Sequence, residues 1–319
     1  MPTARGVRST IVVVTWRGRD HIGACLAALA AQTRAHEVLV LDNASDDGTA
    51  ELISGQRVLR LPRNRGYAGG LAAALPQVKT PFVAWLNDDA APEPGWLAAL
   101  EDTLDADPRA AAAGGVLTDA NGTISSAGVA LTGDGYGMDL REPGETTFGF
   151  CGGSVLLRRG ALVDAGGVPS GFFCYYEDTD TAWRLRLTGW RILLVAGARA
   201  THRLGASSRP GSWPFHRWNE RNRLLTLLRC APLLVALAQL TRFLAITVAL
   251  PARRLRGVAV PDALNYTVGL RLLVFAEVII RLPSTLVARF AIGRRGKVAR
   301  SVVWRTWAGR VALPVEHPA

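Results

Sequence analysis

Short runs of aliphatic and β-branched residues alternate with helix-like segments along the first part of the chain. The runs cover residues 9–15, 37–42, 57–61 and 81–86, and a helix-like segment over 20–31 separates the first two. Buried strands joined through helices by short connections are typical of a parallel sheet covered on both faces. The pattern therefore predicts an α/β fold with a doubly wound, mostly parallel sheet.

Polar residues stand where these runs end. Thr15, Asp42, Asn64 and Asp89 each lie at or just after the end of a predicted strand. The carboxyl ends of parallel strands meet at one edge of the sheet, and ligands of such folds bind there. We therefore expect these four residues to line one ligand site.

Two adjacent carboxylates, Asp88 and Asp89, end the fourth run. Burying an unpaired carboxylate is costly, and two neighbouring ones also repel each other. A Mg²⁺ or Mn²⁺ ion that carries substrate phosphates would satisfy both. Taken alone, these residues fit equally well a solvated turn in which Asp89 caps a helix that starts near Pro94.

Several motifs follow one another in a fixed order. They cover residues 40–49, 64–70, 86–89, 151–159, 172–180 and 201–202. Over roughly residues 8–225 these motifs resemble those of family 2 glycosyltransferases, and most closely the rhamnosyltransferase-like branch that builds bacterial cell-surface glycans. The resemblance implies the GT-A fold of nucleotide-diphospho-sugar transferases, an inverting reaction, and deoxythymidine-diphosphate-rhamnose as the leading donor.

The resemblance assigns a set of residues to the nucleotide-sugar. Asp42 would accept hydrogen bonds from the base or the ribose, although it could also cap the helix beyond the second strand. Asn64 and Gly66 fit a tight turn, and Gly153 belongs to a small-residue floor near the sugar. The nucleotide-sugar set comprises Thr15, Asp42, Asn64, Gly66, Asp88 and Gly153.

Asp89 and His202 are the metal ligands that the resemblance implies, with Mg²⁺ or Mn²⁺ bridging the donor phosphates. The family's acidic motif often begins with Asp, where this chain has Asn87, so Asp88 is a possible substitute ligand. Without the resemblance, a lone histidine such as His202 is more often structural.

Asp178 is the general base that the resemblance implies, and Glu177 would orient the acceptor or share that role. The competing interpretation is that both carboxylates only favour the start of a helix over residues 177–188. The usual Phe-Asp-Glu before this block is replaced by residues 168–171, which leaves the shape of the acceptor side open. A Gly-, Asp- and Thr-rich stretch over 118–147 is expected to be an irregular insert on that side.

Charge divides the chain into two unlike halves. Residues 1–199 hold 18 Lys and Arg against 22 Asp and Glu, whereas residues 200–319 hold 19 against 4. The basic half also contains apolar segments over 230–251 and 264–292, flanked by arginines. Such segments suit an anionic membrane surface, and interior arginines favour helices lying in the interface over spanning ones. A helical cap with solvated arginines is the alternative.

These observations predict a catalytic domain over 1–225 and a basic amphipathic helical region over 226–319, at the cytoplasmic face of the cell membrane. The expected partners are a nucleotide-diphospho-sugar, a lipid-linked or glycan acceptor and anionic lipid. Nucleic acid is not expected, because no recognised binding motif accompanies the basic half. Transfer to a soluble small molecule and non-catalytic sugar-nucleotide binding are the alternative functions. Arg217, Arg221 and Arg223 could contact a phosphate or belong to an interdomain hinge.

Overall fold

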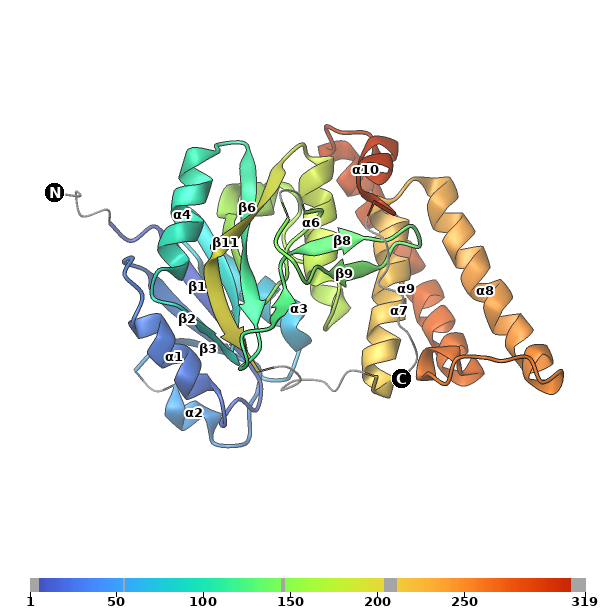
Figure 1. Cartoon of the computed structure of the whole chain (residues 1–319), viewed down its shortest axis with the longest axis horizontal. Helices are drawn as coiled ribbons and strands as arrows, with labels where there is room; N and C mark the ends of the chain where they lie inside the picture. The colour runs from blue at the N-terminus through green and yellow to red at the C-terminus, as the bar shows by residue number, and fades with distance from the viewer. Residues whose placement is uncertain (1–5, 54, 145–146, 204–210, 311–319) are drawn as a thin grey trace.

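A computed structural model of the chain describes residues 6–53, 55–144, 147–203 and 211–310. A large sheet with helices on both faces forms one end of the molecule, and a group of long helices forms the other (Figure 1). The strands are β1 (Ser9–Thr15), β2 (Glu37–Asp42), β3 (Arg57–Arg60), β4 (Phe82–Asn87), β5 (Ala90–Pro92), β6 (Ala110–Thr118), β7 (Ile124–Ser126), β8 (Val129–Leu131), β9 (Gly137–Asp139), β10 (Ser154–Arg158) and β11 (Arg191–His202).

The helices begin with α1 (Ile22–Ala30), α2 (Thr49–Leu52), α3 (Gly66–Ala74), α4 (Trp96–Ala106), α5 (Arg159–Asp164) and α6 (Glu177–Leu187) around the sheet. The helical end contains α7 (Trp213–Cys230), α8 (Leu233–Leu255), α9 (Val268–Arg295) and α10 (Arg300–Trp307). Single 3₁₀ turns cover Leu75–Gln77 (η1), Ser170–Phe172 (η2) and Leu264–Tyr266 (η3).

The main sheet has the strand order β3-β2-β1-β4-β10-β6-β11-β5. Its first four strands are parallel, which confirms the alternating pattern predicted for that part of the chain. β10 then enters antiparallel to both β4 and β6, so the sheet as a whole is mixed. The predicted α/β fold is confirmed. The alternation of strands and helices in the sequence predicted the parallel strands β1 to β4, and it did not predict the antiparallel strand β10.

Hydrophobic cores lie on both faces of the sheet. Ile11 and Val13 belong to one cluster, while Val12 and Val14 belong to the other, because successive strand residues point to opposite faces. A Cβ on Gly70 would lie 2.7 Å from Val14 Cγ1, so α3 packs closely on β1 at this glycine.

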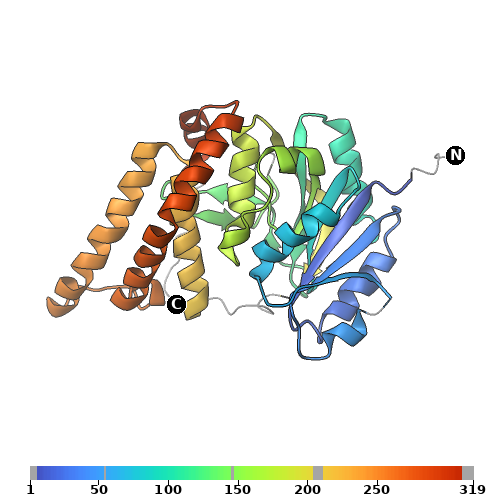
Figure 2. The ribbon, with the colours of Figure 1, turned by 180° about the vertical axis from the view of Figure 1, so that it is seen from behind.

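Helices α7 and α9 lie between the sheet and α8, which is the outermost helix in both ribbon views (Figures 1 and 2). α7 runs across residue 225, and the predicted division of the chain there stays a prediction. Among the described residues, only α8 is long and apolar enough to cross a membrane by length and composition. The stretch over 118–147 is more regular than expected, because it contains β7 and the β8–β9 hairpin.

Candidate functional site

The carboxyl ends of β1, β2 and β4 form one polar edge of the sheet. Thr15 and Asp42 are partners in the β1–β2 register, and β4 pairs with the other side of β1. Asp88 and Asp89 follow directly beyond the end of β4. The sequence-predicted residues of three strands therefore do lie together.

Asp42 is fully buried and only partly satisfied. Its Oδ1 accepts a hydrogen bond from Ser45 N at 2.9 Å, which closes a turn, whereas α2 begins after Gly48. Asp42 is therefore not a helix cap. Its Oδ2 lies 3.3 Å from Arg60 Nη1 but makes no hydrogen bond, and buried Thr15 Oγ1 also has no partner among the described residues. Leaving such atoms unsatisfied costs about 1–3 kcal/mol each, so they are natural contacts for a ligand.

Asn64 and Gly66 form the predicted tight turn. Asn64 Oδ1 accepts from Gly66 N at 2.7 Å, and Gly66 has a φ of 71°. Asn43, at the end of β2, donates to Gly66 O at 3.0 Å and accepts from Arg65 N at 2.8 Å. A Cβ on Gly66 would lie 2.2 Å from Phe173 O, so glycine is required by the approach of this second loop.

Asp88 is paired with a residue that sequence reasoning missed. His21 Nε2 lies 3.1 Å from Asp88 Oδ2, and both side chains are largely buried. Hydrogen bonding to Asp88 raises the pKa of His21. Gly18 leaves room for this contact, because a Cβ there would lie 2.8 Å from Asp88 Oδ2. Asp88 thus faces the β1 side of the site, next to Thr15.

Asp89 faces His202 across the β5–β11 pair. Asp89 Oδ1 lies 3.0 Å from His202 Nε2, and Asn87 Nδ2 lies 3.0 Å from the same nitrogen. β5 follows Asp89 directly, and Gly95 is the N-cap of α4. The alternative in which Asp89 caps that helix is therefore wrong.

The Asp89–His202 pair fits a divalent cation. His202 Nε2 has one lone pair, which either accepts from Asn87 Nδ2 or binds a cation, so an ion held by this pair would take the place of the Asn87 hydrogen bond. Neighbouring ligands of an octahedral ion with bonds of about 2.1 Å are about 3 Å apart, as these two atoms are. The described residues hold no cluster of three or more His, Cys, Asp or Glu that could bind a metal. An ion held here would take its remaining ligands from substrate phosphates and water, as Mg²⁺ commonly does.

The segment that leads into α6 is strained and held from α7. Phe173, Tyr175 and Tyr176 all have φ values of 68°, in the left-handed region that side chains disfavour. Asn222 is fully buried, and its Nδ2 donates to the carbonyls of Phe172, Cys174 and Tyr175 at 3.0, 2.9 and 2.8 Å. Arg221 Nη2 adds a bond to Phe172 O at 2.6 Å. Asn222 and Arg221 of α7 therefore fix the conformation of the segment that precedes Glu177 and Asp178, which we call the acid pair.

Glu177 and Asp178 occupy the first turn of α6. Asp178 Oδ2 accepts from Gly152 N at 3.0 Å, and its Oδ1 accepts from Thr179 N at 2.6 Å. Burial raises the pKa of Asp178 to about 6 and, with the nearby Asp178 charge, raises that of Glu177 to about 8. Because burial raises both pKa values and the two charges repel, the pair holds a proton to a higher pH than two isolated carboxyl groups would.

The acid pair and the strand edge meet on the Gly152–Gly153 floor. A Cβ on Gly152 would lie 3.5 Å from Asp178 Cβ, and one on Gly153 would lie 2.9 Å from Asn87 Nδ2. Tyr67, from α3, donates to Gly152 O at 2.8 Å. A side chain at Gly153 would require Asn87 to shift, whereas a Cβ at Gly152 would make ordinary contacts. Tyr67 is a further site residue that sequence reasoning missed.

Two further groups complete the surroundings. Asp139, exposed on β9, lies within electrostatic range of both His202 and Asp178, so the β8–β9 hairpin borders the site. Arg217 and Arg221 pair with Glu277, and Arg223 pairs with Glu220. Arg221 and Arg223 also donate to Phe172 O and Asp134 O, so they connect the helical end to the sheet end, in agreement with the hinge interpretation. A contact of these arginines with a phosphate stays a prediction.

Residues 10–165 match the model of the family described as Glycosyl transferase family 2. Among curated proteins, the chain is similar to N-acetylglucosaminyl-diphospho-decaprenol L-rhamnosyltransferase of Mycobacterium tuberculosis (strain ATCC 25618 / H37Rv). The two are 29% identical over 229 residues, which are 60% of this chain and 75% of that protein.

Solved structures share the fold at low sequence identity. The mannosyltransferase PcManGT from Pyrobaculum calidifontis, in complex with GDP-Man and Mn²⁺, has a TM-score of 0.52 at 19% identity, covering 95% of this chain and 79% of that chain. GalNAc-T7 with UDP, GalNAc and Mn²⁺ has a TM-score of 0.59 at 14% identity, covering 87% and 57%. S. aureus TarS 1-349 with UDP-GlcNAc has a TM-score of 0.52 at 19% identity, covering 70% and 67%. The fold of this chain is thus that of the GT-A glycosyltransferases.

Proposed function

The chain belongs to glycosyl transferase family 2 through residues 10–165 and is a glycosyltransferase. We propose that it moves a sugar from a nucleotide-diphospho-sugar to a hydroxyl of a lipid-linked glycan. The configuration at the anomeric carbon is inverted in this reaction. One observation carries this proposal: Asp89 with His202, and Asp178, lie on either side of the same Gly152–Gly153 floor. A sugar on this floor would have its phosphates on one side and the acceptor on the other.

The donor nucleotide would bind at Thr15, Asp42, Asn64 and Gly66. Asp42 Oδ2 and Thr15 Oγ1 are buried and make no hydrogen bond among the described residues, although Arg60 lies near Asp42 Oδ2. Both atoms can accept from the imide N–H of a pyrimidine base or from a ribose hydroxyl. We propose deoxythymidine-diphosphate-rhamnose as the donor, because the curated relative is named as an L-rhamnosyltransferase. Asp88 and Gly153 would border the sugar itself.

Asp89 and His202 would hold a Mg²⁺ or Mn²⁺ ion that neutralises charge on the departing diphosphate. Structures of two proteins that share the fold contain Mn²⁺, which is consistent with such a use.

Asp178 would act as general base. Its Oδ2 accepts one hydrogen bond among the described residues, from Gly152 N, so a lone pair remains for an acceptor hydroxyl when the carboxylate is ionised. The proton would pass to Asp178 while the hydroxyl oxygen attacks the anomeric carbon. The nucleotide diphosphate then leaves with the bonding electrons. Glu177, protonated and with Oε2 unpartnered, would donate a hydrogen bond that orients the acceptor.

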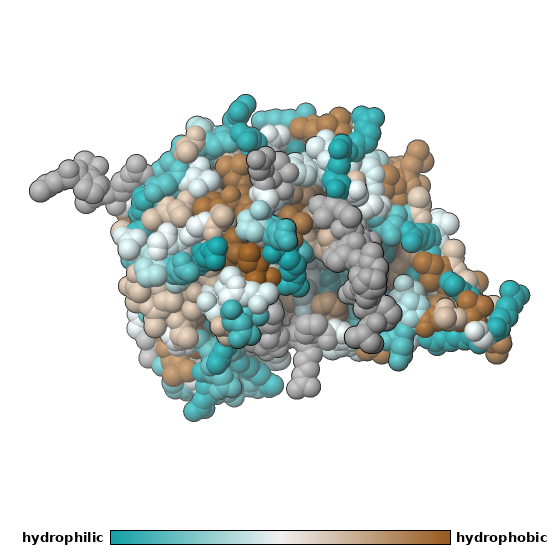
Figure 3. Space-filling view, viewed as in Figure 1, coloured by the Kyte–Doolittle hydropathy of each residue, from teal (hydrophilic) through white to brown (hydrophobic). Residues whose placement is uncertain are grey.

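A membrane surface at the cytoplasmic face would supply the lipid-linked acceptor. Figure 3 shows hydrophobic residues gathered with hydrophilic ones on α8 at the end of the molecule. Leu234, Val248, Ile280 and Val287, on α8 and α9, are 81, 78, 77 and 70% exposed. Gln239 and Arg242 bond to Asp134 of the hairpin, which keeps the middle of α8 against a water-soluble element. These contacts support helices lying in the interface rather than spanning the bilayer.

Donor binding with and without Mn²⁺ tests this function directly. Calorimetry across a panel of nucleotide-diphospho-sugars should find one tight, Mn²⁺-dependent donor, and Asp89→Asn should remove the Mn²⁺ dependence. Glu93→Gln, which changes an acid beyond β5, is the matched control. Absence of binding to every donor would refute the proposed function, and selective binding of uridine or guanosine diphospho-sugars would refute only the rhamnose donor.

A further inference from the structure

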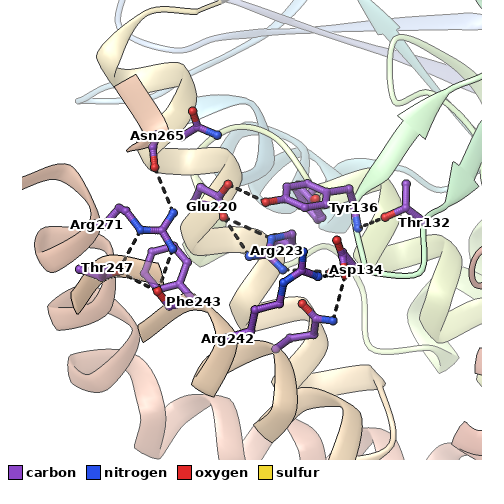
Figure 4. A network of polar contacts seen from close by, with 12 residues as sticks. Thr132, Asp134, Tyr136, Glu220, Arg223, Arg242, Phe243, Thr247, Asn265 and Arg271 are labelled. Atoms are coloured by element: carbon purple, nitrogen blue, oxygen red, sulfur yellow. Dashed lines mark hydrogen bonds and ion pairs between the residues drawn. The ribbon is translucent and has the colours of Figure 1, made fainter. Parts of the chain in front are cut away.

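A second cavity lies away from the strand edge, between the β8–β9 hairpin and the helical end. It has a volume of about 130 Å³, which is room for a small polyatomic ion or several waters. Figure 4 shows the hairpin, α7, α8 and the start of α9 converging on it. The residues that carry its chemistry are Tyr136, Glu220, Arg223, Arg242, Asn265 and Arg271.

Two of the three arginines in this cavity are paired with carboxylates. Arg223 bonds to Glu220 Oε2 through Nε and Nη2 at 3.3 and 3.0 Å, and Tyr136 donates to the same carboxylate at 2.7 Å. Arg242 bonds to Asp134 at the hairpin tip, and its side chain remains 56% exposed. The negative charges of Glu220 and Asp134 therefore balance the positive charges of Arg223 and Arg242.

Arg271 is the positive charge left over. It is 5% exposed, and its hydrogen-bond partners among the described residues are neutral: Thr247 Oγ1, Asn265 O and Phe243 O, at 2.9, 3.0 and 2.8 Å. Glu220 acts on it only through longer-range attraction and is already paired with Arg223. A buried charge without a counter-charge is strongly disfavoured. These bonds use three of the five N–H groups of the guanidinium, so further donors remain for a ligand. The cavity therefore has a net positive lining with unused donors.

The cavity stands between the proposed base and the apolar helices. Tyr176, just before the acid pair, accepts from Gly137 N at 3.3 Å, and a Cβ on Gly137 would lie 2.5 Å from Thr179 Oγ1. Tyr136, the next residue of the hairpin, lines the cavity, and on its far side α8 contributes Phe243 and Ile246. The order along this path is general base, arginine-lined cavity, apolar helix.

We propose that this cavity binds the phosphate groups of a lipid-linked acceptor. The inference rests on the proposed function, and it adds a site for the part of the acceptor between the sugar and the lipid. A glycan joined to a lipid through a diphosphate has the same order of parts: hydroxyl, phosphates, apolar chain. Charge-assisted bonds from Arg242 and Arg271 would hold the phosphates while the chain follows α8.

Binding of geranylgeranyl diphosphate, compared with geranylgeraniol, tests this site without any transfer reaction. The full chain in neutral detergent micelles is titrated with each probe, with EDTA present so that the diphosphate cannot bind through a metal at Asp89. The wild type should prefer the diphosphate by about tenfold or more, and Arg242→Gln and Arg271→Gln should each remove most of that preference. Arg253→Gln, an exposed arginine of α8 outside the cavity, should leave it unchanged.

Several results would overturn the site. They are equal binding of diphosphate and alcohol by the wild type, an equal loss in Arg253→Gln, and displacement of the diphosphate by equimolar phosphatidylglycerol, which would indicate a site for ordinary lipid headgroups. If Arg271→Gln does not fold, the exposed Arg242→Gln decides alone. Donor calorimetry is run on the same proteins: a wild type that binds its donor but shows no preference for the diphosphate refutes only this inference. A persisting preference without donor binding refutes only the proposed function.

Discussion

The strand edge and the helical end both concentrate charge of one sign, but they treat it differently. At the strand edge, Asp42 Oδ2 and Glu177 Oε2 are buried without hydrogen-bond partners in the described part of the chain. At the helical end, guanidiniums bond to main-chain carbonyls: Arg221 to Phe172 O, and Arg289 to Leu228 O and Ala231 O. The acidic excess is left open for ligands, whereas much of the basic excess is used to hold loops and helix ends.

This difference shows why net charge alone is a poor guide to a binding surface. Residues 200–319 carry 15 more basic than acidic side chains, which suggests an extended anion-binding face. An arginine has five N–H donors, and each one that bonds to a carbonyl is no longer available to a ligand. Within the described helices, Arg271 and Arg242 retain unused N–H donors beside a cavity. The part of the basic excess that can bind an anion is therefore confined to this cavity.

The largest expected effect is at the acid pair. Asp178→Asn should lower turnover by about 10²–10⁴-fold, because the amide cannot accept the acceptor proton, while calorimetric donor binding stays within error. Glu177→Gln should cost less, because a glutamine can still donate a hydrogen bond. Near-normal turnover in Asp178→Asn would remove this residue from the role of base.

The next largest effect is at the proposed metal ligands. Asp89→Asn and His202→Ala should each weaken Mn²⁺-dependent donor binding by about 10–100-fold, and they should leave the metal-free affinity unchanged. Calorimetry with and without EDTA measures both quantities. An equal loss in the presence and absence of metal would mean that these residues contact the donor directly.

Asn222 tests whether the helical end supports the strand edge. Asn222→Ala removes three bonds to the strained segment and should lower the free energy of unfolding by about 3 kcal/mol, with a matching loss of turnover. Asn219→Ala, on the same helix, removes one hydrogen bond, to Phe215 O, and is the control. Chemical denaturation and initial rates measure the two effects. Equal losses of stability and of turnover in the two variants would indicate that the helical end does not support catalysis.

The pH profile sharpens the assignment of Asp178. Burial raises the pKa of Asp178 to about 6, with the Asp139 charge adding to the rise, whereas hydrogen bonds from Gly152 and Thr179 lower it. A base must be ionised, so turnover should fall about tenfold per unit as the pH drops below that value. Asp139→Asn removes a charge that raises the pKa of Asp178 and should move this limb to lower pH. A limb that does not move would indicate that another group controls it.

The smallest expected effect concerns the membrane. Ile280→Ser together with Val287→Ser should reduce sedimentation with anionic vesicles several-fold, because two exposed apolar side chains are lost from α9. Val163→Ser, at a residue of α5 that is 47% exposed, is the control on the sheet side. Sedimentation of the wild type should also weaken with added salt. Full solubility of the wild type with vesicles present would favour the alternative of a packed helical cap.

The parts of the site that could be predicted from the sequence are those that follow a strand. Asp42 and Asp89 end long hydrophobic runs, so their place at the edge follows from the geometry of parallel strands. His21 could not be predicted in the same way, because it reaches Asp88 only through the packing of α1 beside β4. Tyr67 likewise reaches Gly152 through tertiary packing alone.

The antiparallel entry of β10 was hidden for a related reason. Its five residues read as a short apolar run, and nothing in such a run indicates direction or neighbours. The strain before α6 was also invisible, because the segment with left-handed residues is held by Asn222, which bonds to the carbonyls of Phe172, Cys174 and Tyr175 from a distant helix. Contacts far apart in the sequence therefore decide the acceptor side, whereas local patterns decide the donor side.

The configuration of the product tests the central claim most directly. Nuclear magnetic resonance of the first transferred sugar, recorded with the donor selected by calorimetry and a lipid-diphosphate glycan acceptor, gives the coupling at the anomeric carbon before any equilibration. A single displacement with Asp178 as base predicts a product of inverted configuration. A product that retains the donor configuration would contradict the account, because it would require a covalent or second displacement step that this arrangement of residues does not provide.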